Sequence, residues 1–225
     1  MKSEEFATAM DKRKKKGEIW TWRMLLCAAF FTLHSSLFTS CSETDSTTVE
    51  FPDWKNQNEA YFERMYQAHD ASTIIPKWSM VPSATPSHTD CILVDKLESG
   101  TGTTSPYYND SVCINYVGHL LPSTSYPSGY VFDRSFNGTF DAATTAPAKL
   151  YNQTSGKYYL PSPSSFISGF TTALLHMHRG DHWRVTIPYQ LGYGNSDNGA
   201  IPANSTLVFD IWLQDFWTTT KGDRD

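Results

Sequence analysis

The sequence has little positive charge outside its first 23 residues. Those residues hold seven of the 18 lysines and arginines, and the chain beyond residue 40 has 11 basic against 19 acidic residues, a net charge of −8. A protein that binds nucleic acid uses lysine and arginine to neutralise phosphates. The charge therefore predicts no nucleic-acid partner. The composition, with 40% hydrophobic and 18% charged residues, is that of a globular protein.

The sequence also lacks a hydrophobic run long enough to span a membrane. The apolar run from Met24 to Leu33 is much shorter than the roughly 20 residues that a bilayer requires. It follows a basic stretch at 12–16 and precedes Cys41, an order typical of a secretory signal. The residues Leu37-Phe38-Thr39-Ser40-Cys41 resemble the lipobox of bacterial lipoproteins, in which the cysteine is acylated. We expect residues 1–41 to be a signal peptide that exports the protein and anchors it to a bacterial membrane through Cys41. An uncleaved anchor or a plain signal peptide would export it as well.

Residues 42–88 are expected to form a tether and an N-terminal helical extension. The polar segment at 42–48 predicts a flexible tether, and residues 71–90, with three prolines, predict an extended linker. Between them, residues 49–70 predict a helix, because Pro52 suits a first helical turn and large apolar residues recur at helical spacing. We favour a helix that packs on its own domain over a docking or dimerising arm. The recurring residues are Trp54, Tyr61, Phe62, Met65 and Tyr66.

Residues 89–217 combine strand patterns with one short helix. Apolar or alternating residues predict strands at 91–97, 112–121, 182–187 and 206–216. Phe170, Ala173, Leu174 and Met177 follow helical spacing within 166–177. This pattern predicts an α+β domain, an antiparallel sheet half-wrapped around one helix, with residues 218–225 as a tail.

Seven short motifs follow one another along this domain, and each of them is weak alone. In this order and spacing they resemble the FKBP-type peptidyl-prolyl isomerases over residues 89–217. The motifs are Asn115-Tyr116-Val117-Gly118, Val131-Phe132-Asp133, Phe166-Ile167-Ser168-Gly169-Phe170, Met177-His178-Arg179-Gly180-Asp181, Leu191-Gly192-Tyr193-Gly194, Ile201-Pro202 and Thr206-Leu207-Val208-Phe209-Asp210.

The resemblance implies a pocket that binds proline-containing polypeptides and isomerises the bond before proline. It implies an aromatic and aliphatic wall with Phe170 as its floor, substrate hydrogen bonds from the Tyr193 phenol and the Ile167 N–H, and an Asp133 that orients the Tyr116 hydroxyl. No cofactor or metal is implied. The implied catalytic residues are Tyr116, Phe132, Asp133, Tyr193 and Phe209, and the implied substrate-binding residues are Phe166, Ile167, Phe170 and Ile201.

The chemistry of prolyl isomerisation explains why such residues suffice. Resonance holds the peptide bond planar with a barrier of about 18–20 kcal/mol, and the cis and trans forms of X-Pro differ by only ~0.5–1 kcal/mol. A catalyst needs no acid, base or nucleophile, but it must bind the twisted amide better than the planar one. The twisted amide has lost charge separation, so a dry apolar pocket favours it.

The sequence departs from the family pattern at four places. The floor is Phe170, where eukaryotic members usually have tryptophan, and Ala148 stands where the family has an aromatic residue after a proline. The arginine that often pairs with the pocket aspartate in the family has no clear counterpart, and Arg134 is the one candidate. Residues 151–165 form an insertion. The altered floor and wall predict weak binding of the family's macrolide inhibitors.

Two further residue groups resemble other kinds of site. Cys91 and Cys113 suggest a disulfide in an exported protein, but the family topology implies two strands between theirs, hence about 14 Å, so we expect two free thiols. His176, His178 and His182 suggest a metal site, but His176 and His178 are two residues apart on a helix and point apart. We therefore expect no metal.

Two functions from different classes are compatible with this sequence. The first is an exported enzyme that isomerises X-Pro bonds in folding proteins. The alternative is a non-catalytic module that binds proline-containing segments in the same pocket, as a chaperone does. Ala148 and the aromatic N-terminal helix favour the alternative somewhat.

Overall fold

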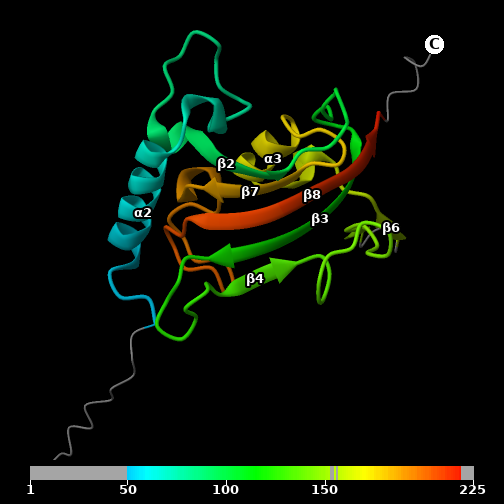
Figure 1. Ribbon diagram of the computed structural model, residues 1–225. Coiled ribbons are helices and arrows are strands. Elements are labelled where there is room, and N and C mark those ends of the chain that lie inside the picture. Colours follow the sequence, from blue (N-terminus) through cyan, green and yellow to red (C-terminus); the bar gives the residue numbers. More distant parts are fainter. Residues whose placement is uncertain (1–49, 153–154, 156, 219–225) are drawn as a thin grey trace, which may run out of the picture. The chain divides into compact units, whose positions relative to one another are not determined.

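The fold is built on a six-stranded antiparallel sheet with one short helix packed against it (Figure 1). The computed structural model describes residues 50–152, 155 and 157–218. The expected signal peptide, Cys41 and the tether therefore lie outside the described residues. The strand order is β1-β2-β7-β8-β3-β4. The helices and strands are α2 (Trp54–Ala68), η1 (Ala71–Thr73), β1 (Ile74–Pro76), η2 (His88–Asp90), β2 (Cys91–Glu98), β3 (Ser111–Leu120), β4 (Val131–Arg134), β5 (Leu150–Asn152), β6 (Lys157–Tyr159), η3 (Pro163–Ser165), α3 (Ser168–Leu174), β7 (His182–Ile187), η4 (Tyr189–Leu191) and β8 (Leu207–Trp217).

The core lies between the sheet and α3, as the sequence pattern predicts. Strand β8 pairs with β3 on one side and β7 on the other, and Leu207, Phe209, Ile211 and Leu213 on one face are all buried. The four residues at helical spacing are buried against them, Met177 included. The helix itself is shorter than expected: α3 ends at Leu174, and turns bonded to the Ala173 carbonyl carry the chain on to Met177. The predicted α+β fold is confirmed.

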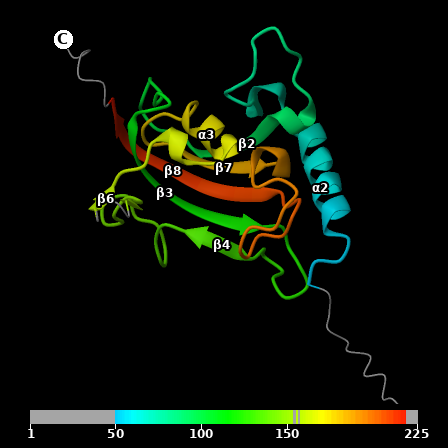
Figure 2. The ribbon, with the colours of Figure 1, turned by 180° about the vertical axis from the view of Figure 1, so that it is seen from behind.

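Helix α2 packs on its own domain, which confirms the interpretation favoured from the sequence. Its inner face buries Trp54, Asn58 and Phe62. Figures 1 and 2 show it across one end of the sheet, with the β5–β6 hairpin at the opposite end. In the part of the chain that the structure describes, no helix has the length and apolarity needed to cross a membrane.

Two segments hold more structure than the sequence pattern indicated. The expected linker at 71–90 contains β1, which pairs with β2 at the edge of the sheet, and two 3₁₀ turns. Strand β1 has three residues and ends at Pro76, so it is too short to show a strand pattern. The insertion at 151–165 begins within the β5–β6 hairpin and ends in the turn η3.

The two cysteines of the domain lie on strands that are separated as the resemblance implied. Strands β7 and β8 separate β2 from β3, so Cys91 and Cys113 lie far apart and both thiols are free. No cluster of three metal-ligating side chains occurs among the residues from 50 to 218 that are described.

Candidate isomerase pocket

A cavity of about 320 Å³ lies at the N-terminal end of α3, over strands β3, β4 and β8. Its volume is at the lower end of the range for small-ligand sites. Helix α3 supplies the floor, the strands supply one wall, and the loop after η4 supplies Tyr193. The lining residues are Tyr116, Asp133, Ser165, Phe166, Ile167, Phe170, Tyr193 and Phe209.

Aromatic rings form the walls and meet mostly edge to face. The centroid of Phe170 lies 5.1 Å from that of Phe209 at an interplanar angle of 87°, and 5.7 Å from that of Tyr116 at 81°. Phe166 lies over Phe170 at 4.6 Å. Edge-to-face pairs are favourable ring arrangements, so these side chains support one another around an apolar space.

Gly118 on β3 makes room for two of the rings. A Cβ at this position would lie 2.5 Å from a ring carbon of Phe209 and 2.8 Å from one of Phe132. Both distances are far below van der Waals contact, so any larger residue would displace the rings. This explains the glycine of the Asn115-Tyr116-Val117-Gly118 motif.

The Tyr116 hydroxyl donates a 2.9 Å hydrogen bond to Oδ2 of Asp133, as the sequence predicted. Burial raises the pKa of Tyr116 above its ordinary value, and the charge and hydrogen bond of Asp133 raise it further. Burial, followed by the charge of Asp133, also raises the pKa of Tyr193. Both phenols therefore keep their protons at neutral pH: that of Tyr116 is donated to Asp133, and that of Tyr193 is available to a carbonyl.

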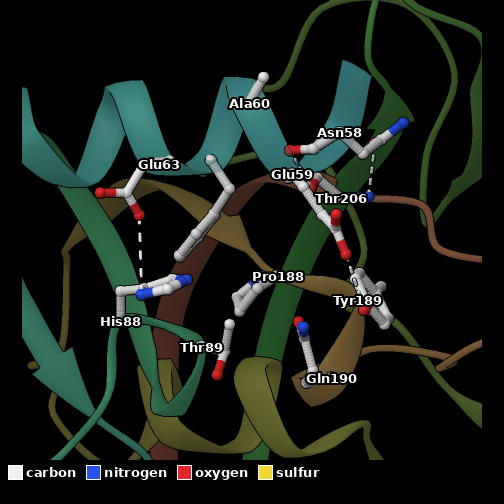
Figure 3. A pocket seen from close by; sticks show the side chains of 11 residues that line it. Asn58, Glu59, Ala60, Glu63, His88, Thr89, Pro188, Tyr189, Gln190 and Thr206 are labelled. Carbon is white, nitrogen blue, oxygen red and sulfur yellow. Dashed lines mark hydrogen bonds and ion pairs between the residues drawn. The ribbon is translucent and has the colours of Figure 1, made fainter. Parts of the chain in front are cut away.

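The segment 188–206 carries Tyr193 and is held at both ends by α2 (Figure 3). Near its start, the Tyr189 hydroxyl donates to Oε1 of Glu59 at 3.0 Å. At its end, the buried Oδ1 of Asn58 accepts from the Thr206 N–H at 2.7 Å, and Nε1 of Trp54 donates to the Ser205 hydroxyl at 2.8 Å. Helix α2 thus braces the loop that positions Tyr193.

A separate cavity of about 350 Å³ lies between α2, η2 and η4. Figure 3 shows Glu59 and Glu63 of α2 above it and Pro188 and Gln190 below. Oε2 of Glu63 lies 3.6 Å from Nδ1 of His88. Phe62, which also lines this cavity, is buried. This cavity shares no lining residue with the aromatic one.

Seven of the nine residues expected from the resemblance line the aromatic cavity, and two lie outside its lining. The ring centroid of Phe132 lies 5.4 Å from that of Phe209, edge to face, and Ile201 is buried in the hydrophobic core. Ser165 lines the cavity but was missed, because nothing in the sequence marks a serine before Phe166. Arg134 forms no ion pair with Asp133 or with any other described residue.

Comparison with known proteins identifies the family. Residues 102–214 match FKBP-type peptidyl-prolyl cis-trans isomerase. The chain is 32% identical over 123 residues to the macrophage infectivity potentiator of Trypanosoma cruzi, covering 54% of this chain and 51% of the relative. It is 28% identical over 127 residues to the isomerase FkpA of Escherichia coli strain K12, covering 56% and 38%. The crystal structure of FkpA from E. coli aligns at a TM-score of 0.47 and 25% identity, over 74% of this chain and 62% of that one.

An antiparallel sheet that encloses an aromatic cavity at the start of a short helix defines the class of domain. The chain belongs to the FKBP-type peptidyl-prolyl cis-trans isomerase family. It spans about half the length, or less, of the curated relatives named above. Helix α2 lies before the matched residues.

Proposed function

We propose that the chain accelerates cis–trans isomerisation of X-Pro bonds in polypeptides that fold outside the cytoplasm. The observation that carries this proposal is the aromatic cavity with two protonated phenols and one carboxylate among its lining residues. Family membership supports the reaction type. Proline-containing polypeptides are then the substrates.

The residues of the cavity suit a reaction that needs no proton transfer. The prolyl ring lies over the floor that Phe170 forms, beside the ring of Phe209, where the twisted amide is disfavoured less than the planar one. The Tyr193 hydroxyl and the Ile167 N–H donate to carbonyls of the flanking chain. Ile167 is the N-cap of α3, and the N–H groups at a helix start have no acceptor within the helix. Binding the twisted form better than the planar one lowers the barrier.

A non-catalytic binding module is the second candidate, and one observation favours it. The family resemblance implies an aromatic residue at the position of Ala148, and Ala148 lines a smaller cavity next to the aromatic one. A less enclosed site binds a proline segment with less preference for the twisted amide. The same change underlies our expectation of weak macrolide binding.

A protease-coupled assay of the chain with a proline peptide separates the two candidates. An enzyme shortens the slow phase in proportion to the amount of protein added. A binding module leaves that phase unchanged while the peptide shifts the NMR resonances of Tyr193 and Phe209. Absence of both effects would show that the site is assigned wrongly.

Export and anchoring remain proposals supported by the sequence of residues 1–41. If Cys41 is acylated, the protein expressed in a bacterium incorporates a palmitate analogue and fractionates with membranes. Cys41→Ala should then lose the label. A Cys41→Ala protein that is still labelled would show that the lipid is elsewhere.

A further inference from the structure

A third, smaller cavity of about 210 Å³ adjoins the aromatic one. Tyr116 and Phe166 line both cavities, so the rings of these two residues form a common wall. The remaining residues of the smaller cavity come from β4, from the chain around β5 and from the approach to η3. They are Arg134, Ser135, Ala148, Lys149, Leu150 and Pro161.

Ala148 is the residue that leaves this space open. Its N–H donates to the Ile114 carbonyl at 2.8 Å, which fixes the backbone beside β3. Its side chain is a single methyl group, the smallest among the residues that line this cavity.

The smaller cavity is positively charged, in contrast to its neighbour. Arg134 and Lys149 line it, both are exposed, and neither forms an ion pair with any residue that the structure describes. The hydroxyl of Ser135 is already bonded to Oδ1 of Asn115 at 2.7 Å. The aromatic cavity carries a carboxylate, Asp133. Two unpaired cations are therefore concentrated in a chain whose part beyond residue 40 is strongly acidic.

We propose that the smaller cavity is a subsite for an acidic side chain of the polypeptide whose proline occupies the aromatic cavity. This inference rests on the proposed isomerase function and adds a substrate preference to it. An extended chain advances ~3.3–3.6 Å per residue, so about two to three residues cross the wall that the side chains of Tyr116 and Phe166 form. The acidic residue thus lies within three residues of the proline. Arg134 and Lys149 bind its carboxylate, and Leu150 and Pro161 contact its methylene groups.

The test uses pairs of proline peptides that differ only in glutamate against glutamine, placed at each of three positions before and after the proline. For the full chain, kcat/KM should be higher for the glutamate peptide at one or two of these positions. One exposed ion pair corresponds to roughly a two- to fivefold effect. The ratio should fall as salt is added, because salt screens exposed charges.

Three variants and one control identify the residues responsible. Arg134→Gln and Lys149→Gln should each lower the glutamate-to-glutamine ratio, and the double variant should bring it to about one. Ala148→Phe should also lower the ratio, because the added ring fills the subsite. Lys55→Gln removes the same charge from α2, away from both cavities, and should leave the ratio as in the wild type.

The outcomes separate failure of this inference from failure of the proposed function. An active wild type with a ratio of about one at every position overturns the subsite, as does a ratio that survives in the double variant. An inactive wild type overturns the proposed function. In that case, NMR titration of the same variants measures the affinities for the same peptide pairs. The glutamate-to-glutamine ratio of these affinities then decides whether the subsite exists. Acetate added in place of the peptides shows whether a free carboxylate binds at Arg134 and Lys149. Acetate binding without any peptide preference counts against the proposal.

Discussion

The two sides of the aromatic cavity differ in how they are held. On one side, two buried residues of α2 fix the segment 188–206: Trp54 donates a hydrogen bond to Ser205, and Asn58 accepts one from the Thr206 N–H. On the other side, Ala148 leaves a gap that exposed cations line. The first side fixes the position of a donor, Tyr193, and the second leaves space for the flanking chain of the substrate. A segment outside the matched family region thus supports the site, while a single small residue inside that region widens it.

The largest effect should come from replacing Trp54, through which α2 holds the segment 188–206. Trp54→Ala deletes a side chain that is 7% exposed, and aromatic-to-alanine changes in a core cost about 3–5 kcal/mol. Tyr159→Ala, at the hairpin, removes a ring that is 47% exposed and should change stability by about 0.5 kcal/mol or less. Urea unfolding measures both. Equal losses would mean that Trp54 anchors α2 no more firmly than Tyr159 holds the hairpin.

The next effect concerns one buried hydrogen bond. Asn58→Ala leaves the buried Thr206 N–H without its acceptor, a loss of about 1–3 kcal/mol in unfolding free energy. The Thr206 amide should also exchange its hydrogen faster than in the wild type. Asn56→Ala, on the exposed face of the same helix, is the control and should do neither. Unchanged exchange at Thr206 in Asn58→Ala would contradict the bracing role of α2.

A smaller effect, on kcat/KM, should distinguish Tyr193 from Tyr189 in the segment 188–206. Tyr193→Phe removes one hydrogen bond to the substrate, about 0.5–1.5 kcal/mol, which is roughly two- to tenfold in kcat/KM. Tyr189→Phe removes an exposed bond to Glu59 of α2 and should lower kcat/KM by less than about twofold. Peptide assays of both variants make the comparison. A larger loss for Tyr189→Phe would mean that its bond to α2 governs catalysis.

The smallest expected effect is that of pH on the rate. The pKa values of Tyr116 and Tyr193 are raised by burial and by Asp133, so both phenols keep their protons throughout the range from neutral to mildly alkaline pH. The kcat/KM of the wild type should therefore be flat between about pH 6 and 9. A tenfold fall within this window would show that a phenol loses its proton there.

The core could be predicted from the sequence because its periodicities are local. The alternation of Leu207, Phe209, Ile211 and Leu213 defined the inner face of β8, and the spacing of Phe170 to Met177 placed α3 against it. Both patterns occupy a dozen residues or fewer, so the chain shows them without knowledge of its neighbours. The order of the strands came from the family resemblance.

The brace and the details of the pocket could not be predicted in this way. Asn58 and Thr206 are 148 residues apart in the sequence, and no local pattern links a helical asparagine to a distant amide. Motifs identified most of the cavity, but they do not distinguish a ring that lines it from one behind it, as Phe132 shows. Ser165 carries no signal at all.

One measurement tests the central claim most directly, namely that this cavity catalyses prolyl isomerisation in folding proteins. A protein whose slow refolding phase is limited by an X-Pro bond is refolded with substoichiometric amounts of the chain. The account predicts a slow-phase rate that rises linearly with the wild type added and rises two- to tenfold less steeply with Tyr193→Phe. A slow phase that the wild type leaves unchanged, although it binds the refolding protein, would contradict it.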